Sequence, residues 1–429
     1  MSYLYLYLGS FGVVLWLYVR RQRRIQASSQ KELQESIEKS LTEPPSLHPL
    51  IDSVRCIGSG SCVKACPEEA LGIVNGKAVL VNAAACIGHG ACLSACPVDG
   101  IKLVFGTETR GIDIPHIGEN FETNVPGIFI AGELGGMGLI RKAAEQGRKA
   151  MDAIRKRSGG KADFDVVVVG CGPAGLSAGL SAIHHKQRYK LLEQEESLGG
   201  AVYHYPRQKI AMTAPVVLDL VGKVKFGEVQ KEKLLEFWQK VVADTGLQIA
   251  FRERMESISR QEDHFVVTTN RTSYTTRNVL LTMGRRGTPR KLDVPGEETH
   301  KVTYRLIDPA QYEGQSILVV GGGDSALEAA IALSEQKNTR VILSYRSEAF
   351  SRVKQKNRDL LQEQERTGKV LVLLKSTVKI IHEQSVEIAH DGHVQTYPND
   401  AVIVCAGGLL PTPLLQKIGI EFETKFGSV

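Results

Sequence analysis

The sequence lacks the charge pattern of a nucleic-acid-binding protein. Its formal net charge is only +6 over 429 residues, four of the positive charges lie together at residues 20–24, and no stretch interleaves basic residues with aromatic ones. Recognition of nucleic acid needs such a basic surface, so we expect no nucleic acid among the partners. The hydrophobic fraction of 42% is ordinary for a globular chain, and the length allows two or three domains.

The sequence also lacks cysteines spread along the chain, which a secreted disulfide framework would need. Six of the eight cysteines lie in two short motifs, and Cys171 and Cys405 stand alone. Such bunching is typical of metal ligation in a reducing compartment. The 42 glycines indicate several tight backbone loops rather than disorder, because the apolar fraction is ordinary.

Residues 3–19 form an uncharged, mostly apolar run of 17 residues, and the arginines of residues 20–24 follow it. As a helix this run would extend about 26 Å at ~1.5 Å per residue, close to the ~30 Å hydrocarbon core of a bilayer. A cleaved signal peptide would carry its basic residues first. We therefore expect a single transmembrane helix that contacts membrane lipid and holds the body of the protein in the cytoplasm, at the inner membrane. An apolar oligomerisation helix is the alternative.

A βαβ pattern begins at residues 165–169, whose four consecutive valines are typical of a buried parallel strand. The strand leads directly into a glycine-rich turn at residues 170–175, then into a helix and a second strand that ends at Glu193. The glycines allow a tight turn and a close approach to a pyrophosphate, which the helix N-terminus attracts. A carboxylate after the second strand accepts hydrogen bonds from ribose hydroxyl groups, so this unit should bind FAD or NAD. A Rossmann-like unit without a phosphate is the alternative.

The pattern recurs at residues 316–344, with a glycine-rich turn at residues 321–326. No acidic residue ends its second strand, and Arg346 and Arg352 follow instead. Cations at this place suit the 2′-phosphate of NADPH, which we expect in preference to NADH. A solvated basic face is the alternative interpretation of these residues.

Residues 163 to about 412 resemble the flavoproteins with two dinucleotide-binding domains, typified by thioredoxin reductase and its ferredoxin–NADP reductase and bacillithiol-reductase-like relatives. The resemblance rests on residues 170–175, Glu193, and residues 198–200, 282–284, 321–326 and 406–408. It implies an α/β fold with two Rossmann-like domains, the first for FAD and the second for NADPH. The residues that it implies for FAD are Gly170, Gly172, Pro173, Ala174, Gly175, Glu193, Gly199, Gly200 and Gly284, and those for NADPH are Gly321, Gly323, Asp324, Ser325 and Ala326, with Arg346 and Arg352 nearby.

The thioredoxin reductase chemistry does not carry over, because residues 289–405 contain only Cys405 and no CxxC pair. We name no catalytic acid or base, since the cofactors carry the chemistry. The family also completes its FAD site with a TNVPGIF-type segment near the end of the chain, whereas here residues 123–133 carry that segment ahead of the first glycine-rich turn. We therefore expect a circular permutation. Gly132 and Glu133 would then bind FAD, with Glu133 in place of the family's Asp.

Two cysteine motifs, CIGSGSCVKACP at residues 56–67 and CIGHGACLSACP at residues 86–97, resemble the two-cluster bacterial ferredoxins. The ferredoxin motif is C-x2-C-x2-C-x3-C-P, and its fourth cysteine serves the other cluster. Transferred to this chain, site one has Cys56, Cys62 and Cys96 with Ser59 at the missing position, and site two has Cys66, Cys86 and Cys92 with His89. Three thiolates suffice for a [3Fe–4S] cluster, and Ser59, His89 or water would complete a [4Fe–4S] cluster. A cluster-free scaffold and an independent zinc site remain alternatives.

The expected domains follow from these motifs. They are an anchor at residues 1–24, a linker at 25–48, a small α+β ferredoxin-like domain at 49–105, the permuted piece of the FAD domain at 106–160, the FAD-binding domain at 161–288, the NAD(P)H-binding domain at 289–405 and a return to the FAD domain at 406–429.

The expected function is that of a membrane-anchored, flavin-dependent NAD(P)H oxidoreductase. It would pass electrons between NAD(P)H, FAD and iron–sulfur clusters and a partner such as a quinone, a cytochrome or a ferredoxin. We expect a homodimer. The alternatives are a flavoprotein whose ferredoxin-like module serves docking or sensing, and a reductase of low-molecular-weight disulfides.

Overall fold

The computed structural model describes residues 2–38, 41–44, 47–108, 110–136, 138–157, 161–205, 207, 209–285, 289–351, 353–409 and 411–427. The chain forms two compact units. The N-terminal unit comprises Met1–Ile112, Ser347–Leu360 and Lys425–Val429, and the nucleotide unit comprises Asp113–Arg346 and Leu361–Thr424.

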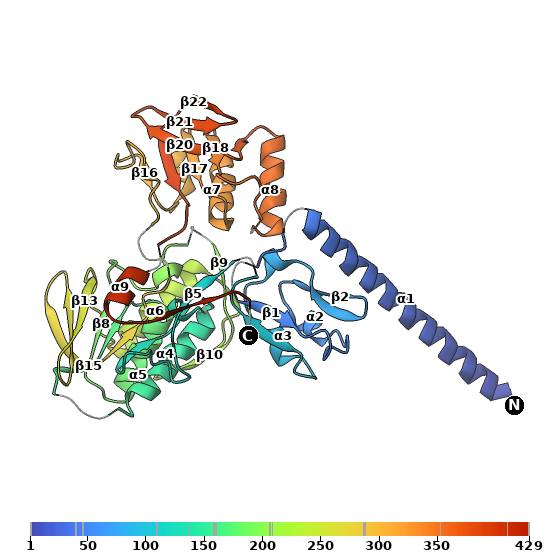
Figure 1. Cartoon of the computed structure of the whole chain (residues 1–429), viewed down its shortest axis with the longest axis horizontal. Coiled ribbons are helices and arrows are strands. Elements are labelled where there is room, and N and C mark those ends of the chain that lie inside the picture. The colour runs from blue at the N-terminus through green and yellow to red at the C-terminus, as the bar shows by residue number, and fades with distance from the viewer. Residues whose placement is uncertain are drawn as a thin grey trace. The chain divides into compact units, whose positions relative to one another are not determined.

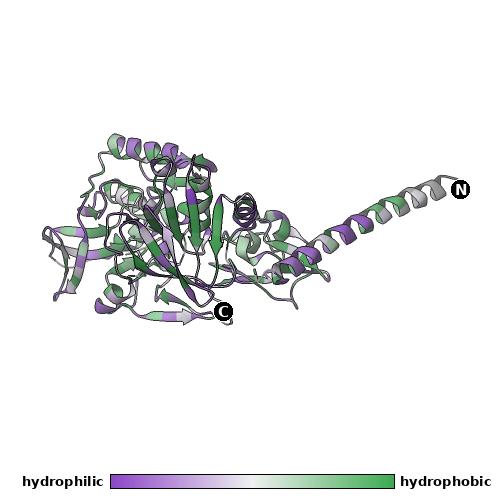
Figure 2. Cartoon of the chain, turned by 90° about the horizontal axis from the view of Figure 1, so that it is seen from above, coloured by the Kyte–Doolittle hydropathy of each residue, from purple (hydrophilic) through white to green (hydrophobic). Residues whose placement is uncertain are grey.

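The chain begins with a single helix, α1 (Ser2–Glu38), which Figure 1 shows in blue. This helix continues without a break through the arginines of residues 20–24, and Figure 2 shows hydrophilic residues along its second half. The C-terminal half also packs onto the ferredoxin-like module, where Ile73 N–H donates a hydrogen bond to the buried Ser29 Oγ at 3.3 Å. Residues 25–38, expected to be a linker, are therefore helical.

The prediction of a transmembrane helix is wrong. Within the part of the chain that the structure describes, no helix is both long enough and apolar enough to cross a membrane. A span needs about 20 predominantly apolar residues, whereas the uncharged run has 17 and includes four tyrosines. The inner-membrane, single-pass localisation rested on this helix and is wrong with it.

The ferredoxin-like module consists of two similar halves. Strand β1 (His48–Ile51) pairs antiparallel with β4 (Ile101–Val104), and β2 (Leu71–Val74) pairs antiparallel with β3 (Lys77–Leu80). Two short helices, α2 (Ser61–Ala65) and α3 (Ala91–Ser94), each start at a glycine in the left-handed region. A small core joins these elements and contains Cys62, Leu71, Ile73, Ala78, Cys92 and Ile101. The module is thus the small α+β domain that the motifs predict.

The first dinucleotide-binding domain is built on a sheet with the strand order β13-β14-β15-β7-β8, with β6 also paired to β15. The strands are β6 (Ile128–Ile130), β7 (Phe164–Val169), β8 (Tyr189–Leu192), β13 (Met255–Arg260), β14 (Phe265–Thr269) and β15 (Ser273–Leu281). Strands β6, β7, β8 and β15 run parallel, and their C-terminal residues are apolar and buried, as expected where a sheet is covered on both faces. Helices α4 (Ile140–Ile154) and α5 (Pro173–His184) lie side by side against it (Figure 1).

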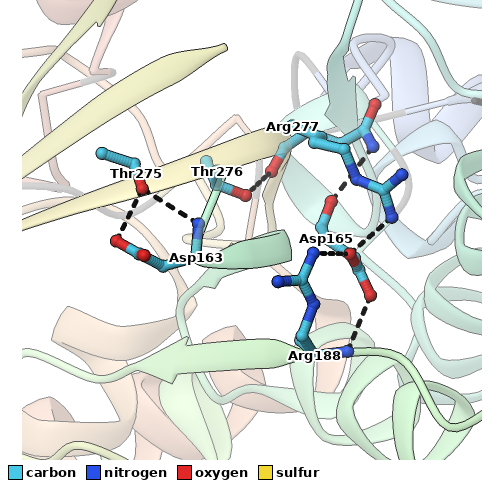
Figure 3. Close-up of polar contacts among 7 residues, drawn as sticks. Asp163, Asp165, Arg188, Thr275, Thr276 and Arg277 are labelled. Carbon is cyan, nitrogen blue, oxygen red and sulfur yellow. Dashed lines mark hydrogen bonds and ion pairs between the residues drawn. The ribbon is translucent and has the colours of Figure 1, made fainter. Parts of the chain in front are cut away.

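A polar network centred on the buried Asp165 links β7 to its two neighbours (Figure 3). The Asp165 carboxylate accepts hydrogen bonds from Arg188 at 2.7 Å and from Arg277. Burial alone would raise the pKa of Asp165, but these hydrogen bonds outweigh burial and hold the pKa below its usual value. The Asp163 carboxylate accepts a further hydrogen bond from Thr275 Oγ1 at 2.7 Å. The network thus joins β7, β8 and β15 at the end away from the glycine-rich turn.

The second dinucleotide-binding domain has a five-stranded parallel sheet in the order β16-β23-β17-β18-β19. Its strands are β16 (Val302–Thr303), β17 (Ser316–Val320), β18 (Arg340–Ser344), β19 (Val370–Leu373) and β23 (Ala401–Val404), and α7 (Asp324–Ser334) packs against them. An antiparallel sheet of β20 (Thr377–Ile381), β21 (Ser385–His390) and β22 (His393–Pro398) adjoins it (Figure 1). The predicted α/β fold with two dinucleotide domains is confirmed.

The remaining elements are shorter or lie at the borders of these domains. They are α6 (Lys231–Thr245), α8 (Gln355–Arg366), α9 (Thr412–Lys417), and the paired strands β5 (Ile112–Pro115) with β24 (Phe422–Lys425), β9 (Ile210–Met212) with β12 (Glu228–Gln230), and β10 (Val216–Leu218) with β11 (Gly222–Val224).

Candidate cofactor sites

The first glycine-rich turn closes tightly between β7 and α5. Gly170 has a φ of +100°, and a Cβ atom at Gly175 would lie 1.8 Å from the Gly170 carbonyl oxygen. No other residue fits at these two positions without moving the backbone. The turn therefore starts α5 at the carboxyl end of β7, where the first N–H groups of the helix can bind a pyrophosphate.

Glu193, which the sequence predicts to bind a ribose, lies against this turn. Its carboxylate is buried and accepts hydrogen bonds from Cys171 N–H at 2.7 Å and from Glu195 N–H at 3.0 Å. Burial raises the pKa of Glu193 even though both N–H groups favour the charged form. The side chain is thus held by the turn itself, in an orientation set before any ligand binds.

Two further predicted groups lie against the same turn. Gly199 N–H donates to the Cys171 carbonyl oxygen at 2.9 Å, and a Cβ at Gly200 would lie 3.1 Å from Gly172 Cα. Gly132 also approaches, because a Cβ there would lie 3.1 Å from Ala174 Cβ. Segments that are far apart in the sequence therefore meet around the glycine-rich turn.

Glu133 lies beside the loop that follows β15. A Cβ on Gly284 would lie 3.7 Å from Glu133 Oε2, and the guanidinium of Arg285 interacts electrostatically with this carboxylate. Burial lowers the pKa of Arg285, while Glu133 and Asp113 oppose that shift. Sequence reasoning missed Arg285, although its position directly after the predicted Gly284 was a usable signal.

The second glycine-rich turn has a similar construction between β17 and α7. Gly321 has a φ of +149° and donates its N–H to the Ser344 carbonyl oxygen at 3.0 Å. Helix α7 begins after Gly323, so the predicted residues Asp324, Ser325 and Ala326 form its first turn. Sequence reasoning gave Tyr345 no role, yet a Cβ at Gly322 would lie 2.2 Å from its ring, so the tyrosine packs directly on the turn.

The end of β18 carries no carboxylate. Ser344 is buried and its hydroxyl bonds to the Ser376 hydroxyl at 2.7 Å, while Arg346 is exposed just beyond the strand. The other predicted cation, Arg352, lies outside the described residues.

The three predicted thiols of site one face one hollow in the ferredoxin-like module. Cys56, Cys62 and Cys96 line this small hollow, and Ser59 lies on its wall. Burial raises the pKa of the Cys62 thiol, and its neighbours Cys56 and Cys96 raise it further. Main-chain N–H groups point at the sulfur atoms, from Ala78 to Cys56 Sγ at 3.4 Å and from Gly100 to Cys96 Sγ at 3.2 Å. Hydrogen bonds of this kind also tune iron–sulfur clusters.

The thiols of site two form a second group. Burial raises the pKa of Cys86 to about 11, and the nearby thiols of Cys66 and Cys92 add to the shift. Glu68 contributes in the same direction. The Cys92 thiol has a raised pKa for the same two reasons, burial first and then Cys66. Each group thus takes thiols from both motifs, as the ferredoxin resemblance implies.

The donor sets of both sites fit iron–sulfur clusters. Each has three thiols, and at site two His89 Nδ1 is buried with no hydrogen-bond partner among the described residues. Within the same described part of the chain, no three His, Cys, Asp or Glu side chains gather closely enough for a single metal ion. None of the eight cysteines, all in described segments, forms a disulfide.

The chain matches two families of known proteins. Residues 167–427 match the pyridine nucleotide-disulphide oxidoreductases, and residues 48–97 match the 4Fe-4S dicluster domain. The predicted resemblance, and the predicted class of NAD(P)H-dependent FAD oxidoreductase, are confirmed at the level of the family. FAD, NADP and a dicluster domain are supported as well, whereas the number and type of clusters stay predictions.

Individual relatives agree with this assignment. A ferredoxin–NADP reductase of Pediococcus pentosaceus is 33% identical over 213 residues, which cover 48% of this chain and 61% of that protein. One from Thermus thermophilus is 29% identical over 271 residues, covering 60% and 77%. The chain thus spans less than two thirds of the length of the Pediococcus protein.

Among solved structures, a bacillithiol disulfide reductase from Bacillus cereus superposes with a TM-score of 0.54 at 24% identity, covering 60% of this chain and 81% of that one, which is a likeness of fold alone. The family matches are stronger evidence for the assignment, because one covers most of the nucleotide unit and the other covers the cysteine motifs. The chain therefore belongs to the pyridine nucleotide-disulphide oxidoreductase family and carries a 4Fe-4S dicluster domain ahead of its nucleotide-binding part.

Proposed function

We propose that this protein exchanges electrons between NADP(H) and a redox partner, with FAD bound in the nucleotide unit and iron–sulfur clusters in the N-terminal unit. The observation that carries the proposal is the sorting of six cysteines into two groups of three, each drawn from both motifs. A scaffold without clusters would have no need to gather thiols in this way. The partner would be a quinone, a cytochrome or a soluble ferredoxin.

The residues around the first glycine-rich turn would bind FAD. The N–H groups at the start of α5 would hold the pyrophosphate, Glu193 the adenosine ribose, and Gly132 and Glu133 the ribityl side. When bound, FAD accepts a pair of electrons from a nicotinamide and releases them singly, and iron–sulfur clusters carry one electron at a time. Arg285, half-buried near Glu133, would attract that carboxylate and help to hold it in place.

The second turn would bind NADP(H) rather than NAD(H). The first domain holds a buried carboxylate at the end of its second strand, whereas the second domain has Ser344 there and an exposed Arg346 beyond it. An arginine can pair with the two negative charges of a 2′-phosphate, and no carboxylate at the strand end repels that phosphate. Tyr345, packed on Gly322, would fix the path of the chain that presents Arg346.

A circular permutation accounts for the position of β6 and α4 ahead of β7 in the chain. Strand β6 pairs in parallel with β15, with Ile128 opposite Val279 and Ile130 opposite Leu281. Helix α4 follows β6 and packs on α5. In this proposal the segment of residues 106–160 completes the FAD-binding domain from the N-terminal side, and its earlier place in the chain brings the cysteine motifs next to it in sequence.

The ferredoxin–NADP reductase relatives suggest what the fused module does. Those proteins are named for a reaction with ferredoxin, and this chain carries a ferredoxin-like module of its own. We infer that the module takes the place of a diffusing ferredoxin, so that electrons pass within one chain before they reach the partner.

The test is anaerobic purification of the full chain, followed by measurement of FAD, iron and acid-labile sulfide. NADPH and, separately, NADH are then added while flavin absorbance and the EPR spectrum are recorded. We expect bound FAD, bound iron and sulfide, and a change of the cluster EPR signal on addition of NADPH. A protein with FAD reducible by NADPH but without iron would refute the electron-relay function.

A further inference from the structure

We propose that the two cluster sites are unequal. At site two the imidazole of His89 supplies the fourth ligand of a [4Fe–4S] cluster, whereas site one keeps three thiolates and holds a [3Fe–4S] cluster. This inference rests on the proposed function, because it assumes that both sites bind clusters.

The two cysteine loops share one backbone conformation, so positions 59 and 89 are equivalent. Gly58 and Gly88 have φ values of +68° and +75°, and Gly60 and Gly90 have φ values of +72° and +80°. Each loop then enters a short helix that carries the next cysteine. Residue 59 lines the hollow of its own site, so by this equivalence residue 89 belongs to the lining of site two.

His89 has an unused ligand atom at this position. Its Nδ1 is buried, and no described residue forms a hydrogen bond with it. A buried polar atom without a partner is destabilising, so a native structure usually provides one. Iron is a suitable partner, because imidazole is a good ligand for it.

Ser59 differs from His89 both in its exposure to solvent and in its hydrogen bonding. It is exposed, and its hydroxyl already takes part in local hydrogen bonds, donating to Ser61 Oγ at 3.3 Å and accepting Ser61 N–H at 3.4 Å. To bind iron as a strong ligand, the serine would have to break these contacts and lose its proton. Site one therefore has no fourth ligand that is ready to bind.

A carboxylate is the competing candidate at site two. Glu68 Oε1 is also buried without a partner among the described residues, and its charge acts on Cys86. His89 is favoured because it occupies the position of the missing cysteine, whereas Glu68 follows the proline of the other motif. The variants below separate the two candidates.

The unequal ligands would give the two sites different reduction potentials. Replacing a thiolate by a neutral imidazole removes one negative charge, and this exchange raises the potential of iron–sulfur clusters. One chain would then hold two one-electron carriers with distinct potentials, which an electron relay can use in sequence.

The test compares iron content and EPR spectra of the full chain with those of three variants, all normalised to bound FAD. The wild type should hold about seven iron atoms, from one cluster of each type. His89→Ala should hold about six and show a doubled [3Fe–4S] signal. Ser59→Ala, the matched change at the equivalent position, should leave both readouts unchanged. Glu68→Gln should also leave the iron content unchanged.

Pulsed EPR of the reduced wild-type protein provides a test that needs no variant to fold. Protein labelled with ¹⁵N-histidine should show a nitrogen coupling to the [4Fe–4S] cluster. In His89→Cys the iron content should stay at about seven while this coupling disappears, since a thiolate then holds the fourth iron.

Several results would overturn the inference alone. They are about eight iron atoms in the wild type, equal iron loss in Ser59→Ala and His89→Ala, iron loss in Glu68→Gln but not in His89→Ala, or no nitrogen coupling. A wild-type protein with FAD and no iron would instead defeat the proposed function as well.

Discussion

Helix α4 lies so close to the first glycine-rich turn that only glycine fits at residue 147. A Cβ atom at Gly147 would lie 2.1 Å from the Ala174 carbonyl oxygen, and both partners are backbone or Cβ atoms that cannot rotate away. In an open helix, Gly→Ala would stabilise by up to ~1 kcal/mol. Overpacking of this kind costs about 1–3 kcal/mol. We therefore expect Gly147→Ala to destabilise the protein by up to about 2 kcal/mol.

The same substitution should weaken FAD binding, because Ala174 belongs to the turn that we propose binds the pyrophosphate. If about two thirds of a ~2 kcal/mol strain reaches the turn, the Kd for FAD rises roughly tenfold, since ~1.4 kcal/mol corresponds to a factor of ten. The assays are urea unfolding followed by tryptophan fluorescence and titration of FAD by its fluorescence.

Gly179→Ala on α5 is the matched control. A Cβ there would lie 2.7 Å from Leu247 Cδ1, a side-chain atom away from the glycine-rich turn, so this substitution should leave FAD binding nearly unchanged. If Gly147→Ala is as stable as the wild type and binds FAD equally well, α4 does not pack on the turn. The proposal that the segment of residues 106–160 completes the FAD site would then fail.

Three further predictions concern the other parts of the molecule. Asp165→Asn should lower the free energy of unfolding by about 2 kcal/mol, because it leaves Arg277 without its partner. Since the folded-state pKa of Asp165 is lowered, the stabilisation by its carboxylate is present above the unfolded pKa of ~3.9 and is lost as the pH falls through the folded-state pKa. Unfolding of wild type and variant at pH 7 and pH 3 checks this, and an equal loss of unfolding free energy at both pH values would contradict it. Arg346→Ala should raise the KM for NADPH about tenfold and leave that for NADH unchanged; parallel changes for both would show a structural role. Gly58→Ala should remove about three iron atoms, because its Cβ would lie 2.0 Å from the Gly76 carbonyl oxygen. Gly60→Ala is the control, since Gly60 has a similar φ but open space around its Cβ position, and this variant should retain the iron. Equal iron loss in both variants would point to backbone strain instead.

Local motifs predicted the nucleotide-binding domains well, since a valine-rich strand and a glycine-rich turn restrict the chain within a few residues. The roles of Arg285 and Tyr345 could not be predicted in this way, because they depend on contacts with Glu133 and Gly322 that only the folded chain brings about.

The prediction of a transmembrane helix failed for a different reason. The helix continues for 19 residues beyond Val19, and its second half packs on the ferredoxin-like module, a contact between segments distant in sequence. Hydropathy over a short window reports neither the length of a helix nor its neighbours. The cysteine groups were predictable because a fixed spacing, taken with the ferredoxin resemblance, assigns each thiol to a site.

The crossing of thiols between the two motifs has a consequence for assembly. Cys96 completes site one and Cys66 completes site two, so a cluster at either site ties together both halves of the module and orders part of the neighbouring site. Metal binding contributes to folding when the unbound ligands are unordered. Loading should therefore be cooperative: a preparation given half the iron that it can hold would divide into fully loaded and empty molecules, with few that carry a single cluster.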